Sequence, residues 1–330
     1  MGNDIKITGD MTPIAEGIKD NLLSIPSGIE KLLCLAFGEK YIKRVRSLYL
    51  SKAQIAHDIN KILAGELVFD GNEVSYQNLP SIQNQILINK SISESANIIK
   101  CIEHAINIMK DKEEQNFSED ISRTFFNRWR NEAQFISEEN IQYLWGKILA
   151  EEVSYPNKFS LATIDILKNI GNREATIFDK ISPYIIFGEN MLMGDDYKKP
   201  LPNVSVQDLQ ILNDIGLLEY RFAYATTGYL LKTQRCDSNA FFLDISDYAL
   251  IIYTDNAPNV SFQRLTKAGR ELYNIMAIPS IDQISETGRF LLNQKEFQQV
   301  NKIEILKYVK KATVEGECHQ TEDVCWVVKE

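Results

Sequence analysis

The feature that most constrains the fold is the spacing of apolar residues in "ISEENIQYLWGKILAEEV", which runs from Ile136 to Val153. These residues recur at positions i, i+3, i+4, i+7 and i+8, which places them on one side of an α-helix. The stripe therefore predicts a helix packed on a core, with Trp145 as its anchor and Gly146 permitting close helix approach. The stripe consists of Ile141, Leu144, Trp145, Ile148 and Leu149.

Two serines are expected to cap helices in this region, because a serine hydroxyl accepts hydrogen bonds from the first turn. Ser118 is the expected N-cap for "SEDISRTFFNRWRNEAQF", and Ser137 is the expected N-cap for the helix that carries Trp145. Carboxylates surround that helix, and Glu151 and Glu152 are adjacent to each other. Adjacent helical residues diverge by about 100°, so these two predict a solvated face rather than a paired-carboxylate acid–base site.

The remainder of the N-terminal half is also predicted to be mostly helical. "LVFDGNEVSY" is the exception and predicts a short hairpin with Asp-Gly in its turn. In the helix expected after Pro80, the residues expected on the apolar side are Ile98, Ile99, Ile102, Ala105 and Ile106. The other expected helices lie in 24–37, 39–65, 160–170 and 172–181.

From Pro183 onward, aromatic and β-branched residues alternate with turn signals. "SVQDLQILNDIGLLEY" predicts a helix that ends at Gly216, and "NAFFLDISDYALIIYTDNAPNVSFQRL" predicts strands with a turn at "DNAPN". "TKAGRELYNIM" predicts a further short helix. This order is typical of a winged-helix-like module. One more helix is expected around Lys295 to Lys311, followed by a polar tail.

The expected fold class is mainly α with a smaller α+β part. A helical N-terminal and central region precedes the winged-helix-like module. The expected regions are an N-terminal helical region at 1–66, a central helical domain with the Trp motif at 67–183, the winged-helix-like module at 184–276, and a C-terminal helix and tail at 277–330.

Composition points to a cytoplasmic protein without a membrane span. The net charge of −9 and pI near 5.1 disfavour nucleic acid or anionic lipid as a partner for the whole chain, although a local basic patch could bind either. The five cysteines include no CxxC pair, which favours reduced thiols. The longest apolar run, Leu32 to Phe37, is far shorter than the roughly 20 residues of a transmembrane helix.

A search for catalytic patterns predicts neither a cofactor nor a metal site. The sequence contains no GxxxxGK[ST], GxGxxG or GxSxG motif. Its three histidines have no triad-like neighbours, and Cys318, His319 and Cys325 lack the paired close spacing of zinc ligands. "GDD" at 194–196 could bind a divalent cation, but we expect a turn there.

The strongest charge anomaly is an amphipathic segment near the N-terminus with a basic patch. An ordinary helix with a basic outer face is the favoured interpretation, while binding to anionic lipid or a phosphate backbone stays open. Charge complementarity would also allow the patch to meet acidic helices of this chain or of a second copy. The patch consists of Lys40, Lys43, Arg44 and Arg46.

The segment 125–181 resembles a bacterial family of unknown function. The shared pattern is I-S-x-E, Q-x-L-W-x-x-I-L-A, P-x-x-F-S, L-K-N and E-A-x-x-F, and the later "GLL" and "LTKAGREL" also resemble that family. Three positions depart from it: Glu151 and Asn157 each replace a usual Gly, and Ala162 replaces a usual Arg. The matching residues are Ile136, Ser137, Glu139, Gln142, Leu144, Trp145, Ile148, Leu149, Ala150, Pro156, Phe159, Ser160, Leu167, Lys168, Asn169, Glu174, Ala175 and Phe178.

The family is more distantly similar to the alpha-type abortive-infection proteins of phage defence. This resemblance implies no catalytic residues, and it favours a non-enzymatic interaction or regulatory protein of bacterial or prophage origin. A protein partner or self-association is the expected mode of action. The alternatives are a nucleic-acid-binding regulator and an unrecognised hydrolase or nuclease. The expected motif or interaction residues are Gln142, Trp145, Glu151, Ser160 and Thr163.

Overall fold

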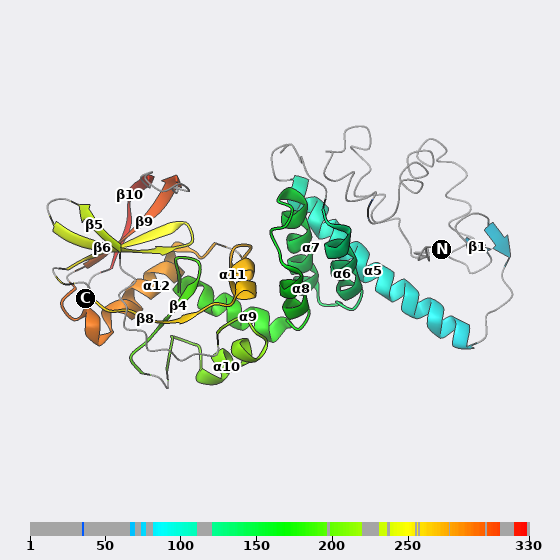
Figure 1. Ribbon diagram of the computed structural model, residues 1–330, viewed down its shortest axis with the longest axis horizontal. Helices are drawn as coiled ribbons and strands as arrows, with labels where there is room; N and C mark the ends of the chain where they lie inside the picture. The colour runs from blue at the N-terminus through cyan, green and yellow to red at the C-terminus, as the bar shows by residue number, and fades with distance from the viewer. Residues whose placement is uncertain are drawn as a thin grey trace. The chain divides into compact units, whose positions relative to one another are not determined.

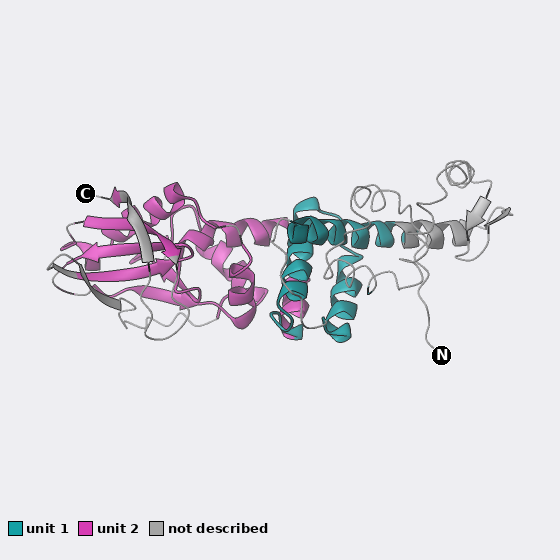
Figure 2. Cartoon of the chain, turned by 90° about the horizontal axis from the view of Figure 1, so that it is seen from above, with its two compact units in different colours: residues 1–161 teal, residues 162–330 magenta. Residues whose placement is uncertain are grey.

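A computed structural model describes most of the chain from residue 82 onward. The chain divides into two compact units, residues 1–161 and 162–330 (Figure 2). It is mainly α with a smaller α+β part, as predicted, whereas the expected division into four regions stays a prediction. The described residues are Leu35, 67–69, 74–76, 82–110, 121–196, 199–219, 231–235, 238–254, 256, 258–276, 278–300, 302–310 and 320–328.

In the first unit a short hairpin precedes three helices that pack on one another (Figure 1). The hairpin confirms the prediction for "LVFDGNEVSY", because its strands are antiparallel with Leu67 opposite Tyr76. The elements are β1 (Leu67–Phe69), β2 (Val74–Tyr76), α5 (Ile82–Lys110), α6 (Arg123–Ala133) and α7 (Glu139–Ser154).

The apolar side of α5 is confirmed as part of the core. That side packs on α7, which brings two segments about 40 residues apart in sequence into contact. Most helical stability comes from burying such a face rather than from intrinsic propensity. The predicted residues Ile98, Ile99, Ile102, Ala105 and Ile106 are all buried.

The start of α6 differs from the expectation. The helix begins at Arg123, and its N-cap is Ser122, whose hydroxyl accepts from the Phe125 N–H at 3.5 Å. Ser118, the predicted cap, lies outside the described residues. Both serines have the chemistry of a cap, so sequence alone did not decide between them.

Ser137 does not cap α7, which corrects the second cap prediction. The N-cap position is Glu138, and its side chain makes no capping hydrogen bond. The Ser137 hydroxyl lies instead 3.5 Å from a carboxylate oxygen of Glu138. The acidic Glu139 in the first turn stabilises the helix by interacting with its positive N-terminal end.

The described part of the second unit combines helices with a three-stranded and a five-stranded antiparallel sheet. Its elements are α8 (Leu161–Leu167), α9 (Asn172–Ile181), η1 (Ser182–Tyr184), β3 (Ile185–Ile186), β4 (Asn190–Met193), α10 (Val206–Asp214), β5 (Leu231–Arg235), β6 (Ser238–Ile245), β7 (Tyr248–Tyr253), β8 (Ser261–Arg264), α11 (Lys267–Tyr273), α12 (Ile281–Leu292), η2 (Lys295–Phe297), β9 (Lys302–Lys310) and β10 (Gln320–Val328). The predicted helices at α8, α9, α10 and α11 are therefore present.

The three-stranded sheet has the order β3-β4-β8, and α11 follows β8 directly. After α10, Leu218 forms a β-bridge to Leu265. Thr266 then caps α11 by accepting from the Gly269 N–H at 3.2 Å. A Cβ on Gly269 would collide with the Leu217 carbonyl oxygen. The "LTKAG" pattern thus supplies a helix cap and a close backbone approach.

The five-stranded sheet has the order β10-β9-β7-β6-β5, and α12 packs against its β9 and β10 strands. β6 and β7 form a tight hairpin in which Ile245 lies opposite Tyr248. The expected turn at "DNAPN" falls in the connection from β7, in the five-stranded sheet, to β8, in the three-stranded sheet. Asp255 and Ala257 lie outside the described residues, so the turn itself stays a prediction.

The predicted helix around Lys295 to Lys311 is also wrong. The helix lies earlier, at α12, and 302–310 forms β9. Ile303 and Ile305 on β9 lie opposite Ile252 and Leu250 on β7, where β-branched side chains pack well. The expected polar tail contains β10, which pairs with β9. Strand β7 therefore pairs with the C-terminal strand β9, and a winged-helix arrangement stays a prediction.

No helix in the described part of the chain combines the length and the hydropathy that a bilayer-spanning segment needs.

Candidate functional site

Trp145 is the core anchor that the stripe predicted. Its side chain is 0% exposed, and its ring lies 6.3 Å from that of Trp129. The Trp129 Nε1–H donates to the Trp145 carbonyl at 3.0 Å, which joins α6 to α7. The four other stripe residues are buried or half-buried. Trp145 therefore supports the fold.

Gly146 permits the close approach of α5 and α7, as predicted. A Cβ on this residue would lie 2.5 Å from His104 Cβ and 2.7 Å from the Cys101 carbonyl oxygen. Cys101 is itself fully buried at this crossing, and burial raises the pKa of its thiol to about 12. A thiol with so high a pKa is a poor nucleophile at neutral pH.

Gln142 holds α5 to the connection between α6 and α7. Its side chain is 1% exposed, and its Nε2 donates to the Ile136 carbonyl at 2.8 Å and to Asn97 Oδ1 at 3.3 Å. Asn97 Nδ2 donates in turn to the Gln134 carbonyl at 2.9 Å. The side-chain N–H groups of Gln142 and Asn97 thus satisfy two backbone carbonyls in this connection.

Glu152 holds the turn that follows α7. Its side chain is 1% exposed, and its carboxylate accepts from the backbone N–H groups of Asn157 at 2.8 Å and Phe159 at 3.0 Å. The predicted solvated face is therefore wrong for Glu152, because the turn folds back over it and supplies two donors. Glu151 lies 2.6 Å from Lys158 Nζ and closes the same turn.

Asn157 has a φ of 67°. This left-handed conformation favours glycine and is tolerated by asparagine. Asn157 therefore fits the turn without a glycine.

The predicted motif residues do not meet at one point. Gln142 and Glu151 are nine residues apart on α7, so the helix rise separates them by about 13 Å. Ser160 is half-buried just before α8, and Thr163 is buried on α8. Further along the signature, the Glu174 carboxylate accepts from the Gly171 N–H at 2.9 Å and caps α9. These positions serve the fold at separate places.

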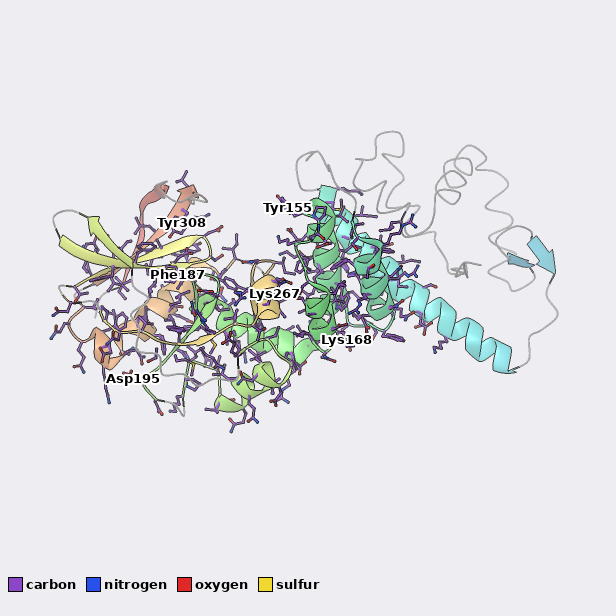
Figure 3. All side chains as sticks on the ribbon, viewed as in Figure 1. Tyr155, Lys168, Phe187, Asp195, Lys267 and Tyr308 are labelled. Atoms are coloured by element: carbon purple, nitrogen blue, oxygen red, sulfur yellow. The ribbon has the colours of Figure 1, made fainter. Side chains whose placement is uncertain are left out.

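Among the described residues of the first unit, three large aromatic side chains are exposed, and sequence reasoning missed them. Phe135, Tyr143 and Tyr155 are 65%, 47% and 48% exposed. Tyr143 meets the edge of His104 with ring centroids 5.5 Å apart, and Lys158 Nζ lies 5.3 Å from the Tyr155 ring centre. Tyr155, at the end of α7, is labelled in Figure 3. Hydropathy pattern alone gives no signal that separates these rings from core aromatics.

In the second unit, the clearest polar cluster lies on the five-stranded sheet. The Tyr253 hydroxyl donates to Glu304 at 2.7 Å, and Lys302 Nζ lies 2.9 Å from the other carboxylate oxygen. Lys302 Nζ also lies 4.5 Å from the Tyr253 ring centre. Both carboxylate oxygens of Glu304 therefore have a partner. The cluster links the neighbouring strands β7 and β9 and stabilises their pairing.

The "GDD" segment is hydrogen-bonded to the chain at Gln294 and Lys295. Asp195 Oδ2 accepts from the Lys295 N–H at 2.7 Å, and the Asp195 N–H donates to Gln294 Oε1 at 2.8 Å. Across the described ranges, no three His, Cys, Asp or Glu side chains gather as a potential metal site.

Several predicted features fall outside the described residues and stay predictions. They are the basic patch at Lys40, Lys43, Arg44 and Arg46, and the pair Cys318 and His319, whereas Cys325 lies on β10.

One family model matches the chain, over residues 81–193, and its description is "Protein of unknown function (DUF2806)". The range spans α5 to β4 and contains the whole signature from Ile136 to Phe178. The chain thus carries a domain of a family of unknown function, as the resemblance predicted. No curated protein and no solved structure matches it.

Proposed function

We propose that this chain is a non-enzymatic protein-interaction or regulatory protein of bacterial or prophage origin, acting in phage defence of the abortive-infection type. One observation carries the proposal. In the first unit, Gln142, Glu151 and Glu152 make contacts within the fold, whereas large aromatic rings remain on the surface. That distribution is typical of a scaffold that presents a contact surface.

The engaged polar groups argue against a role in chemistry. A general acid or base must reach a proton on the substrate within about 3 Å. The Glu152 carboxylate accepts from two backbone N–H groups of its own turn, and the Gln142 Nε2 donates to the Ile136 carbonyl and to Asn97. Moving either side chain toward a substrate would break these bonds.

The exposed rings support a protein partner. Tyrosine and phenylalanine are enriched in protein interfaces, where a rigid ring gives a large contact area at low entropic cost. Lys158 and His104 lie against Tyr155 and Tyr143, which restrains these rings before any partner binds. Exposed Phe135 is the most hydrophobic of the three and the best candidate for an anchor.

We extend the proposal to the winged-helix-like interpretation of 184–276. Support comes from α10, the Leu218–Leu265 bridge and the capped α11. A winged helix that reads DNA usually presents basic residues on its recognition helix. "VQDLQILND" of α10 contains no Lys or Arg, so the module is proposed to bind a protein rather than DNA.

Phage plating on cells that express the chain tests the proposal. The surface variant combines Phe135→Ser, Tyr143→Ser and Tyr155→Ser, and the polar variant combines Glu151→Gln with Ser160→Ala. Loss of protection only in the surface variant, with both proteins folded, is the expected result. Loss only in the polar variant would favour the hydrolase alternative and reject the interaction proposal.

A further inference from the structure

One edge of the five-stranded sheet is formed by β10, which pairs with β9 on one side (Figure 1). Among the strands that the structure describes, none pairs with the other side of β10. The opposite edge strand, β5, has five residues, whereas β10 has nine. A long edge strand presents a row of backbone N–H and C=O groups to a further strand. Of the two edges, β10 is therefore the better template for strand addition.

The residue types of β10 change along the strand. Its first half contains Glu322 and Asp323, and its pairing with β9 shifts in register up to Trp326. Charges and irregular pairing are features that protect a sheet edge from further strands. From Trp326 to Val328 the pairing is regular, and "VCWVV" at 324–328 contains no charged residue, proline or glycine. The last part of β10 is therefore a regular and uncharged edge.

Val327 is an apolar residue that remains accessible at this edge. It lies opposite Glu304 of β9, and its side chain is 40% exposed. An antiparallel sheet usually presents polar residues on a face that meets water, and an exposed valine gains little from folding. A further strand beside β10 would cover Val327 and accounts better for a valine at this position.

The sequence of this stretch reads nearly the same in both directions. Around Trp326 as the centre, Val324 corresponds to Val328, and Cys325 corresponds to Val327. Cysteine and valine are both small and apolar. Two copies of the stretch that run antiparallel therefore place like residues opposite each other at every position.

The charges on either side of the stretch are also complementary when its direction is reversed. In the sequence, Asp323 precedes the stretch and Lys329 follows it. In an antiparallel pair centred on the stretch, the acidic residue of each copy meets the basic residue of the other, and opposite charges across strands are favourable. The next residues outward, Glu322 and Glu330, are both acidic. The complementary stretch is therefore 323–329.

We propose that a second copy of this chain pairs with β10, with the two β10 strands antiparallel around a two-fold axis near Trp326. The axis places Val324 of each copy opposite the partner's Val328, and it joins the two five-stranded sheets into one continuous sheet. A two-fold contact requires a surface that is complementary to itself. A stretch that reads alike in both directions meets this requirement, whereas the binding of an unrelated peptide would not need it.

Cysteine cross-linking in the full-length chain tests the register. Trp326→Cys is expected to form a disulfide-linked dimer, because facing residues of antiparallel strands have Cα atoms about 4.5–5.5 Å apart, within reach of a disulfide. Val324→Cys and Val328→Cys are each expected to stay monomeric under denaturing conditions, since the two copies of either residue are offset by about 13 Å along the strands. An equimolar mixture of these two variants is expected to cross-link. The background replaces every native cysteine except the buried Cys101 by serine.

Val327→Lys tests the contact in the chain with its native cysteines. A lysine on an edge strand opposes strand addition, so this change is expected to weaken self-association by about tenfold or more. Val309→Lys is the matched control. Val309 is 65% exposed on β9, which already has a strand on each side, so the same substitution is expected to leave self-association unchanged. Sedimentation velocity measures both effects, and circular dichroism checks that each variant is folded.

Four results would each overturn the inference. They are a monomeric wild-type chain, no disulfide in the Trp326→Cys variant, cross-linking of Val324→Cys alone, and a loss of self-association in Val309→Lys equal to that in Val327→Lys. A dimer that only Val327→Lys disrupts, with cross-linking at position 326, is the expected outcome. β10 lies in the second unit, so none of these results depends on the exposed rings of the first unit.

Discussion

Gly146→Ala is expected to destabilise the first unit, although the same change on an exposed helix would stabilise it. The new methyl group would lie 2.5 Å from His104 Cβ, 2.7 Å from the Cys101 carbonyl oxygen and 3.0 Å from the Ala105 amide nitrogen. These atoms belong to the backbone of α5 or are bonded directly to it. No rotamer change can relieve the contact, so α5 and α7 must separate.

The magnitude follows from two opposing effects. Overpacking a well-packed core costs about 1–3 kcal/mol, and a contact with backbone atoms belongs in the upper part of that range. Replacing a helical glycine by alanine recovers about 1 kcal/mol. The expected net loss in the free energy of unfolding is therefore about 1–2 kcal/mol.

Urea denaturation followed by tryptophan fluorescence measures this loss. Trp129 and Trp145 lie beside the α5–α7 crossing, and a Trp326→Phe background removes the remaining tryptophan signal. Asn140→Ala, at an exposed position in the first turn of α7, serves as the control and is expected to change stability by less than about 0.5 kcal/mol. A Gly146→Ala protein as stable as the parent would refute the close packing of α5 on α7.

Three further predictions use the same protein. Trp145→Ala is expected to cost about 3–5 kcal/mol in urea denaturation, because it empties a fully buried site; a cost below about 1 kcal/mol would contradict the core role. Glu152→Gln is expected to lower the free energy of unfolding by about 2 kcal/mol, because the Glu152 carboxylate accepts two backbone hydrogen bonds. An unchanged free energy of unfolding would mean that the turn is stable without these hydrogen bonds. Burial raises the Cys101 pKa from 9.0 to about 12, so iodoacetamide is expected to spare Cys101 at pH 8 until urea unfolds the chain. As pH rises, the Cys101 thiol ionises first in the unfolded chain, so the stability that this group contributes is lost above about pH 9. Rapid labelling of Cys101 in the folded protein, detected by mass spectrometry, would contradict its burial.

The helical core was predictable because its evidence is local. Ile98, Ile102 and Ala105 recur at helical spacing, as do Trp145 and Ile148, and a helix must bury such a stripe. The spacing of the apolar residues identifies which side of each helix is buried. It also gave the correct role for Gly146, since a glycine beside a core tryptophan indicates close approach.

The strands of the C-terminal part were harder to predict because their evidence is non-local. Ile303 and Ile305 form part of a strand only when β7 lies beside them. "KIEILKYV" also contains apolar spacings compatible with a helix, and short apolar runs do not separate the two. The pairing of β9 with β7 joins residues about 50 to 60 positions apart, which no local pattern records.

Burial of polar and aromatic side chains in the candidate site was likewise decided by tertiary contacts. Glu152 is buried because the turn at Asn157 folds over it, while its neighbour Glu151 pairs with Lys158. Phe135 is exposed although Phe125, ten residues earlier, is buried. The sequence shows which side chains are polar or aromatic. It does not show which of them a following turn will bury.

Hydrogen exchange of the full-length chain, measured by mass spectrometry with and without an extract of phage-infected cells, tests the central claim most directly. The account predicts that amides of 141–153 exchange slowly in both samples, because that part of α7 is core. It also predicts that amides of 134–139 exchange more slowly with the extract, because a protein partner covers the exposed Phe135 ring. Unchanged exchange at 134–139 together with protection elsewhere would contradict the assignment of the interaction surface.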